Sequence, residues 1–480
     1  KREKKYLKAV SLLNEAMTKN PRLKDKIKKI LGSIYATWGR ELKIAKRYKE
    51  AVYKLKRAIR QNPDDLASKY NLAEVYWNMG EKDKAISLWQ DVIKIDSGRY
   101  PKAREILLSL LSDNEGEIPE LKSGKAWDDV LREARLSRIS PLIYRRLKKR
   151  NVPSVPDKFK KAVKRDYLST LAFNLWLLDE LNKLLKNFRV KGIKAIVLKG
   201  AFLAEKVYPD PGLRPMTDLD LLVRREEMAS AHTVLETGGF QAIDQRRSHF
   251  PPPFTAYLNS LDYRRPGRTF PSIHLHWHLV NSGTPAPMFT EKVNMDKVWK
   301  EAVEIKMDGI DVLTLSPHHM LLHLCEHGLR VRHSLSQLIL LFDIDRIIKY
   351  YGEELRWERV IEEGRAFGWD KLCFISLYAA RRFVHAPVRP EIIKALWPEK
   401  LVWEDKIFYN LLKGKKQFPG ASYFIYLGMN RGVFNKIRFI LSTFFPPGPI
   451  LAQRRYSSDV KNKYYWDRLG EVFSSLLRFF

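Results

Sequence analysis

Two aspartates that stand one residue apart have the types and the spacing to do chemistry. Asp218 and Asp220 lie in MTDLDLLV (216–223), an apolar run with the composition of a buried strand. In a strand, residues two apart point to the same face, so the two carboxylates project side by side. Burying neighbouring carboxylates is costly unless a cation or hydrogen bonds compensate. The pair is therefore either an ordinary solvated strand end or a hard-oxygen site suited to Mg²⁺.

A turn suited to phosphate binding precedes the aspartates. GIKAIVL (192–198) predicts a short buried strand, and Lys199-Gly200 leads from it into the helical pattern AFLAEKVY (201–208). A glycine at such a turn lets an anion approach the backbone, and the helix N-terminus offers free N–H groups to phosphate. A phosphate cradle and metal-binding carboxylates are the minimum that nucleotidyl transfer requires. The two features together favour a nucleotidyltransferase site more strongly than either does alone.

The elements that must position these residues form a small α/β unit. Residues 192–280 read strand–helix–strand–helix–strand–strand, and a hairpin pattern and then helices follow almost to the end. The predicted fold is α+β and mostly helical, with a small mixed-sheet core. We expect strands at 192–198, 216–223, 254–265 and 272–280 and a hairpin at 303–315. We expect four regions: helical repeats at 1–115, a helical lead-in at 116–190, the α/β core at 191–315 and a helical C-terminal region at 316–480.

The N-terminal region carries an internal repeat. YKEAVYKLKRAIRQNP (48–63) aligns with EKDKAISLWQDVIKID (81–96), so that Ala51 matches Ala85 at an offset of 34 residues. This offset is the period of tetratricopeptide helix pairs, whose stacked helices usually leave a concave binding face. We therefore expect tetratricopeptide-like repeats that bind a protein partner. The alternative is a short helical cap on the next domain.

The stretch around the two aspartates also resembles a known family. LKGAFLAEKVYPDPGLRPMTDLDLLV (198–223) and IHLHW (273–277) are similar to the uncharacterised nucleotidyltransferase family, which has a polymerase-β-type nucleotidyltransferase fold. The resemblance extends over roughly residues 125–480 and leaves the repeats outside.

The resemblance implies roles for particular residues. Asp218 and Asp220 would hold the metal, Mg²⁺ or Mn²⁺, and an NTP would be the substrate. Gly200 takes the place of the phosphate-binding turn, and Lys199 and Arg214 are the candidates to contact phosphate or substrate.

Two positions depart from the superfamily's pattern. The superfamily has Gly-Ser after the first strand, whereas this chain has Lys-Gly-Ala and lacks the serine that contacts phosphate. The third carboxylate, which serves as general base, is expected where this chain has His274. A neutral imidazole can ligate metal or accept a proton, so we count His274 as catalytic beside Asp218 and Asp220. Asp262 on the neighbouring predicted strand is an alternative third carboxylate.

Histidines form two further groups. HLHWH (274–278) would place three imidazoles on one face of a strand, where they could ligate metal. His319, His323 and His327 recur at i, i+4 and i+8 on a predicted helix, a spacing that could hold zinc. The sequence has no H-E-x-x-H motif, so histidines that line the cleft or are satisfied in the core stay open as alternatives. A second D-x-D at 343–345 lies on a predicted helix, where residues two apart do not share a face.

The charge balance favours anionic partners. The 480 residues carry a formal net charge of +32, and the first 60 hold 20 Lys and Arg against 5 Asp and Glu. Such a field favours RNA, DNA, nucleotides or an anionic membrane surface. The alternative is a solvated helix face that serves solubility alone.

The composition is otherwise that of an ordinary globular protein, with 45% hydrophobic and 12% aromatic residues. No window offers about 18 uninterrupted apolar residues, so no spanning helix is expected. The chain begins KREKKYLKAV, with neither an initiator Met nor an apolar leader, and we expect a trimmed chain without a secretion signal. The two cysteines, Cys325 and Cys373, exclude a disulfide scaffold. We predict a cytoplasmic protein.

These observations predict a metal-dependent nucleotidyltransferase that transfers an NMP group from an NTP to an acceptor. The positive charge favours RNA, tRNA included, whereas the repeats favour a protein acceptor or a protein partner that delivers the acceptor; a small molecule is the third option. The alternative function is a catalytically degenerate nucleotidyltransferase-fold adaptor that recruits partners through its helical repeats.

Overall fold

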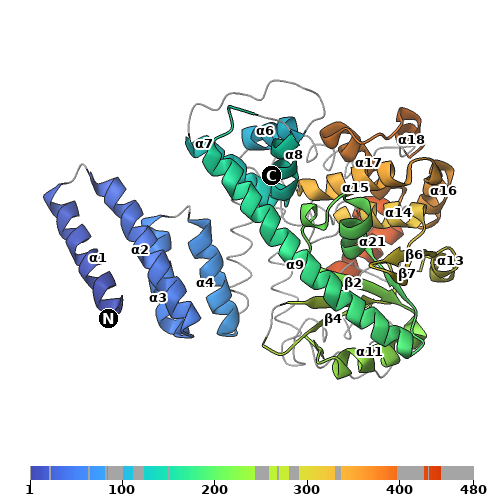
Figure 1. The fold of residues 1–480 in the computed structure, drawn as a ribbon, viewed down its shortest axis with the longest axis horizontal. Helices are drawn as coiled ribbons and strands as arrows, with labels where there is room; N and C mark the ends of the chain where they lie inside the picture. The colour runs from blue at the N-terminus through green and yellow to red at the C-terminus, as the bar shows by residue number, and fades with distance from the viewer. Residues whose placement is uncertain are drawn as a thin grey trace. The chain divides into compact units, whose positions relative to one another are not determined.

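The chain folds into two compact units in a computed structural model, Lys1–Arg99 and Tyr100–Phe480 (Figure 1). Each unit has its own hydrophobic core. The structure describes residues 2–20, 23–62, 65–81, 84, 101–111, 124–149, 152–243, 259–267, 270–280, 291–329, 337–396, 426–430 and 432–444.

The first unit is built from packed helices. Ala51 and Ala58 on α3 are fully buried, and α3 packs against α2. A Cβ added to Gly39 on α2 would lie 2.6 Å from Leu55 Cγ on α3, so the missing side chain of Gly39 lets the two helices approach closely. The second copy of the repeat, 81–96, lies largely outside the described residues. The described helices of this unit are α1 (Arg2–Lys19), α2 (Lys24–Ile44), α3 (Tyr48–Gln61) and α4 (Leu66–Asn78).

A mixed sheet organises the second unit and confirms the expected α+β fold. Within the described residues seven strands lie in the order β3-β4-β5-β2-β1-β7-β6. β2 is antiparallel to β1 and parallel to β5, and β1 is parallel to β7. The strands are β1 (Ala195–Val197), β2 (Asp218–Val223), β3 (Gln241–Ala242), β4 (Ser260–Arg264), β5 (Ser272–His276), β6 (Val303–Met307) and β7 (Ile310–Thr314).

The predicted hairpin is present, and the strand expected at 272–280 is the one that is shortened at its C-terminal end by several residues. β6 and β7 pair antiparallel around Asp308 and Gly309, whose φ values of 46° and 77° are typical of a type I′ turn. The strand expected at 272–280 ends at His276. Beyond it the backbone N–H of Val280 donates to Nδ1 of His278 at 3.0 Å, a local hydrogen bond that replaces the strand ladder.

Helix α9 (Asp157–Val190) fixes the loop that leads into β2. Asn174 on this helix donates from Nδ2 to the carbonyl oxygens of Pro211 and Arg214, at 2.6 Å and 2.8 Å. One face of α9 carries a buried apolar stripe at helical spacing that joins the core: Leu177, Leu181, Leu184 and Phe188. The helix therefore both covers core and positions the approach to Asp218.

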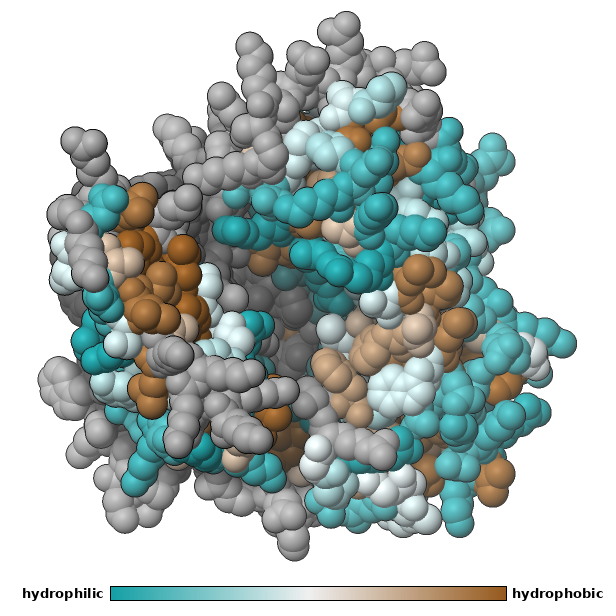
Figure 2. Space-filling view, turned by 60° about the vertical axis from the view of Figure 1, so that its left-hand side comes forward, coloured by the Kyte–Doolittle hydropathy of each residue, from teal (hydrophilic) through white to brown (hydrophobic). Residues whose placement is uncertain are grey.

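Helices that precede and follow the strands along the chain complete the second unit (Figure 1). Hydrophilic side chains dominate the described surface in Figure 2, with smaller hydrophobic areas between them. Among the described helices, none has the length and apolar character needed to cross a bilayer. The helices of this unit are α6 (Pro101–Leu111), α7 (Gly124–Leu136), α8 (Ser140–Lys149), α10 (Lys199–Phe202), α11 (Met228–Thr237), α13 (Met295–Lys300), α14 (Pro317–Gly328), α15 (Leu338–Tyr351), α16 (Trp357–Ala366), α17 (Asp370–Val384), α18 (Pro390–Ala395) and α21 (Val433–Phe444).

Candidate functional site

The antiparallel pairing of β1 and β2 brings the Lys-Gly turn beside the two aspartates. β1 ends where β2 begins, and the backbone N–H of Leu198 donates to the carbonyl oxygen of Asp220 at 3.1 Å. The next residue, Lys199, begins α10, so the first turn of this helix lies at the same edge of the sheet as the carboxylates. The two features that the sequence separates by one helix therefore meet in space.

Asp220 is the centre of a buried ionic network. Its side chain is 3% exposed, with Oδ2 3.0 Å from Lys199 Nζ and Oδ1 3.1 Å from His276 Nε2. Burial raises the pKa of Asp220, but the charge of Lys199 and hydrogen bonds from His274 and His276 outweigh it and hold the pKa well below its usual range. Among the described residues no group donates a well-directed hydrogen bond to Oδ2. The carboxylate is ionised, and Lys199 is the ion-pair partner of its Oδ2.

His274 lies in a row of carboxylates that crosses three strands. The strand register places it directly between Asp220 on β2 and Asp262 on β4. Its Nδ1 is 3.4 Å from Asp220 Oδ1 and 3.5 Å from Asp218 Oδ2, and its Nε2 is 3.8 Å from Asp262 Oδ1. Burial lowers the pKa of His274, but Asp220, Asp262 and Asp218 together raise it to about 9. An imidazolium therefore occupies the position where the third carboxylate was expected.

The raised pKa predicts a stability that depends on pH. The protonated imidazole of His274 stabilises the fold fully below its unfolded pKa of 6.5, and this contribution is lost as the pH rises through about 9. A shift of this size corresponds to at most about 3 kcal/mol, less because the side chain is 28% exposed. Calorimetry in EDTA should give a higher melting temperature for wild type than for His274→Gln at pH 6, and equal melting temperatures near pH 10. A difference that does not change with pH would contradict this assignment.

His276, one of the three histidines of HLHWH that we considered as possible metal ligands, joins the site. It is buried, and its imidazole lies against Asp220. Burial lowers the pKa of His276 more than Asp220 raises it, so the neutral ring donates its Nε2–H to the carboxylate. The alternation in HLHWH was the signal for this residue. His278 does not share that face, because the strand ends before it.

Arg214 lies beside the turn but is committed to an internal ion pair. Its Nη2 is 2.8 Å from Asp343 Oδ2, and Tyr208 donates its hydroxyl to Asp343 Oδ1 at 2.8 Å. Burial lowers the pKa of Arg214, but Asp343 outweighs burial and raises it. As predicted, the second D-x-D is on a helix and its two members have different partners: Asp345 pairs with Lys349.

A second arginine, Arg138, approaches the same loop and was not predicted. It stands between α7 and α8 with φ of +58° and donates from Nη2 to the carbonyl oxygen of Pro215 at 2.9 Å. Burial, and then the neighbouring charge of Arg214, lower the pKa of Arg138. Two guanidinium groups therefore flank the loop that leads to Asp218.

The protein's own packing leaves room at Gly200. A Cβ added there would lie 3.5 Å from Arg214 Nη1, 3.7 Å from the Asp218 carbonyl oxygen and 3.9 Å from Met216 Sδ, all ordinary van der Waals distances. The chain does not need glycine at this position for its own fold. A ligand that approaches the backbone would need it.

The donor atoms fit a divalent cation. Asp220, His274 and His276 each offer a ligand atom, all within 4.8 Å of one another. Asp218, predicted to share the metal with Asp220, lies against His274 and outside this group. Carboxylate oxygens suit Mg²⁺ and Mn²⁺, and Oδ2 of Asp220 accepts no well-directed hydrogen bond from the described residues. The cationic His274 must lose its proton before it could itself ligate.

The structure does not bring together the predicted histidine set on α14, which was His319, His323 and His327. In the second group of ligating side chains among the described residues, His319 joins Glu301, His318 and Glu363. His323 and His327 lie on the same helix with their rings 6.2 Å apart, outside that group.

Comparison with known proteins identifies the family. The model of the uncharacterised nucleotidyltransferase family matches residues 123–385, more than half of the 480, and a tetratricopeptide repeat model matches residues 42–96. A solved structure of an antigenic nucleotidyltransferase-like protein from Paracoccidioides brasiliensis is similar over 48% of this chain and 91% of its own, with 17% identity and a TM-score of 0.26. No curated protein matches. Both predicted resemblances are thereby confirmed, and the chain belongs to the uncharacterised nucleotidyltransferase family.

Proposed function

We propose that this protein transfers a nucleoside monophosphate from an NTP to an acceptor, with Mg²⁺ or Mn²⁺ bound by Asp218 and Asp220. The observation that carries the proposal is the meeting of the Lys199-Gly200 turn with these two carboxylates where β1 ends and β2 begins. When bound, the cation would neutralise phosphate charge and lower the pKa of the attacking hydroxyl.

The chain's own residues have distinct parts in this proposal. The N–H groups of the first turn after Leu198 bind phosphate, and Gly200 lets the phosphate come close. Lys199 holds Asp220 in place through their 3.0 Å ion pair. The neighbouring carboxylates favour the protonated form of His274. A bound cation would oppose this effect and favour the neutral ring. The neutral imidazole can then accept the proton of the acceptor hydroxyl.

The experiment that tests the proposal is incubation of the full chain with each α-labelled NTP, Mg²⁺ or Mn²⁺, and RNA, protein and small-molecule acceptor fractions. We expect label to enter one fraction with release of pyrophosphate. Absence of NTP binding and of transfer under all of these conditions would contradict it. The comparisons offer nothing in favour of the alternative of a degenerate adaptor.

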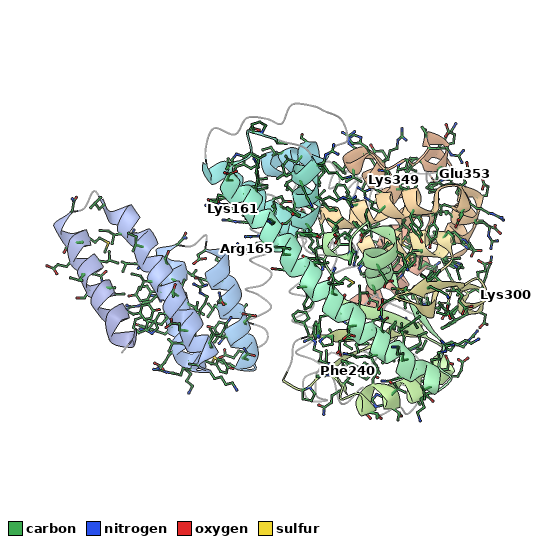
Figure 3. The ribbon with its side chains drawn as sticks, in the orientation of Figure 1. Lys161, Arg165, Phe240, Lys300, Lys349 and Glu353 are labelled. Atoms are coloured by element: carbon green, nitrogen blue, oxygen red, sulfur yellow. The ribbon has the colours of Figure 1, made fainter. Side chains whose placement is uncertain are left out.

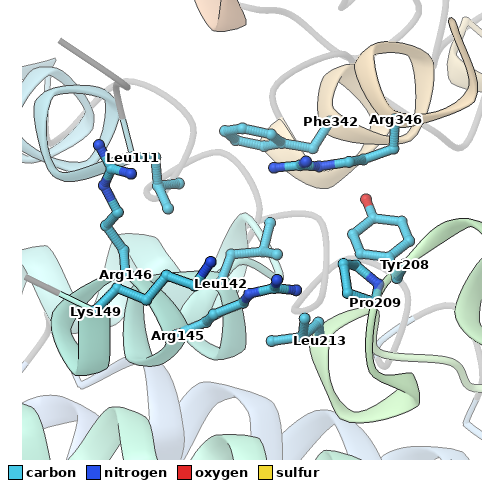
Figure 4. A pocket seen from close by; sticks show the side chains of 10 residues that line it. All are labelled: Leu111, Leu142, Arg145, Arg146, Lys149, Tyr208, Pro209, Leu213, Phe342 and Arg346. Carbon is cyan, nitrogen blue, oxygen red and sulfur yellow. The ribbon is translucent and has the colours of Figure 1, made fainter. Parts of the chain in front are cut away.

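A basic pocket supports an anionic acceptor. A cavity of about 180 Å³ has a floor of buried apolar and aromatic residues and a rim of cations from α8 and α15, and none of the described residues that line it is acidic. Figure 4 shows Arg145 reaching toward Tyr208 and Leu213, with Arg346 beside Phe342. The lining residues are Leu111, Leu142, Arg145, Arg146, Lys149, Tyr208, Pro209, Leu213, Phe342 and Arg346.

The pocket is linked to the candidate site by one buried ion pair. Tyr208 lines the pocket and donates to Asp343, which holds Arg214, and Arg214 in turn lies beside Gly200. Phosphate groups are the natural ligands of clustered arginines. We therefore propose an acceptor that carries phosphate, RNA first, and a protein partner for the N-terminal repeats.

This proposal predicts weaker RNA binding when the rim loses charge. Arg145→Gln with Arg346→Gln should lower the affinity for an RNA oligonucleotide and reduce the slope of log K against log salt by about one per lost phosphate contact. Fluorescence anisotropy over a salt series measures both quantities. The matched control is Lys161→Gln with Arg165→Gln, which removes the same charge from the exposed face of α9 (Figure 3). An equal loss in the control would show that net charge, not the pocket, attracts RNA.

A further inference from the structure

A second cluster of ligating side chains lies where the β6–β7 edge of the sheet meets the C-terminal helices. Glu301 stands between α13 and β6, His318 and His319 are in the first turn of α14, and Glu363 is on α16. One ligating atom of each lies within 4.8 Å of the others. His319 is fully buried and Glu363 is 2% exposed. Three separate elements therefore converge on one small polar volume inside the fold.

The two carboxylates are each divided between an outer cation and the inner histidines. Glu301 accepts from Arg359 through Oε1 at 2.5 Å, while its Oε2 lies 2.9 Å from His318 Nε2. On the other side Glu363 pairs with Lys297 through Oε1, and its Oε2 faces inward. A basic residue thus orients each carboxylate from outside and leaves one oxygen directed at the imidazoles. This is how outer-shell partners hold the carboxylate ligands of a metal.

His319 is oriented in the same manner and is left incomplete. Its Nδ1 lies 2.9 Å from the hydroxyl of Ser316, and its Nε2 faces Glu363 Oε2 at 3.8 Å. Among the described residues Nε2 has no hydrogen-bond partner, although the side chain is fully buried. Burial, and then His318, lower the pKa of His319 to about 3, so the ring is neutral. A neutral buried nitrogen that faces a carboxylate without a partner is costly, and a cation between the two would satisfy both.

We propose that Glu301, His318, His319 and Glu363 form a structural site for a zinc-type divalent cation. Two imidazole nitrogens and two carboxylate oxygens make a four-ligand set that suits tetrahedral Zn²⁺, and a set with four protein ligands leaves no position for substrate. The bound ion would tie the start of α14 to α16 and to the turn between α13 and β6. This site shares no residue with the Asp218 site.

Metal analysis of the full chain tests the site. The protein is loaded with Zn²⁺ alone, desalted, and its zinc measured by mass spectrometry in an Asp218→Asn, His274→Gln background that weakens the other cluster. We expect about one zinc per chain, and a melting temperature that falls by about 5–10 °C after dialysis against EDTA. His319→Gln should lose the zinc, whereas His323→Gln, equally buried on the same helix, should keep it.

Two results would overturn the proposal. One is a His319→Gln protein that retains as much zinc as its parent. The other is a parent protein that holds no zinc after loading and whose melting temperature does not respond to EDTA. Should His319→Gln fail to fold, the EDTA measurement on the parent still decides, because it requires no substitution in this cluster.

Discussion

Replacing Asp218 by asparagine is expected to abolish nucleotidyl transfer while leaving the fold intact. The Asp218 side chain is 32% exposed, and among its ion-pair contacts is His274 at 3.5 Å, so loss of its charge costs little stability. The same change removes one of the two carboxylates proposed to hold the catalytic cation. Charge stabilisation by such an ion is worth several kcal/mol in the transition state, which corresponds to about 10³-fold in rate.

Transfer of label from an α-labelled NTP and release of pyrophosphate would measure this effect. The matched control is Asp311→Asn, which removes an exposed carboxylate from β7 in the same sheet and should leave the rate unchanged. An Asp218→Asn protein as active as wild type would exclude the proposed metal pair. Asp262→Asn answers a separate question: a comparable loss there would identify Asp262 as the third carboxylate of the site.

Asp220 would not serve for this experiment. It is buried against Lys199 and His276, so Asp220→Asn leaves a buried ammonium group without its counter-ion. Breaking a buried pair in this way typically costs about 3–5 kcal/mol. Any loss of activity would then be mixed with loss of fold, whereas Asp218 separates the two.

Gly200→Ala is expected to block NTP binding without destabilising the protein. Gly200 is the second residue of α10, where alanine is more favourable than glycine by up to about 1 kcal/mol. The added methyl group meets only ordinary contacts, the nearest at 3.5 Å. A phosphate on this turn would be pushed away from one or two backbone N–H groups. Hydrogen bonds to charged groups are worth about 1.5–3 kcal/mol each, so the loss of one should lower the NTP affinity about 10- to 100-fold, and the loss of two should lower it further.

Isothermal titration with each NTP, together with a melting curve, measures both halves of this prediction. Gly32→Ala is the control. Gly32 is also helical, it lies in the first unit, and a Cβ added to it would meet Asn62 of the same unit at 3.5 Å. This substitution should leave NTP affinity unchanged. If Gly200→Ala binds NTP as wild type does, phosphate does not approach the backbone at this turn.

Local patterns in the sequence were sufficient to predict the helices and strands, and to predict which neighbouring residues share a face of an element. Alternation placed Asp218 and Asp220 on one face of a strand, and the hairpin pattern at 303–315 corresponds to β6 and β7. The helical periodicity around 343–345 correctly separated the second D-x-D. Each of these depends on a period of two or of about 3.6 residues, which is a property of the backbone itself.

Contacts between distant segments were not predictable in the same way. The pairing of Arg214 with Asp343 joins residues 129 apart, and nothing in either local pattern signals it. Arg138 reaches the site from a left-handed position between two helices, a conformation that an arginine seldom adopts and that no turn residue announces. The prediction that His278 shares a face with His274 and His276 was wrong for a local reason. The side chain of His278 accepts a hydrogen bond from the nearby N–H of Val280, and the strand ends before this residue although the alternation in the sequence continues.

The ion pair between Arg214 and Asp343 also bears on where the α/β core can be cut. Asp343, on α15, is fully buried and neutralises an arginine that is 8% exposed in the loop before β2. A chain truncated after β7 would keep the seven described strands of the sheet and yet lose this counter-ion, together with the partner of Tyr208. We expect such a fragment to be insoluble or molten, although its sheet is complete. The change of pattern near residue 315 marks where strands give way to helices along the chain, and we expect the smallest piece that folds to extend past it and include α15.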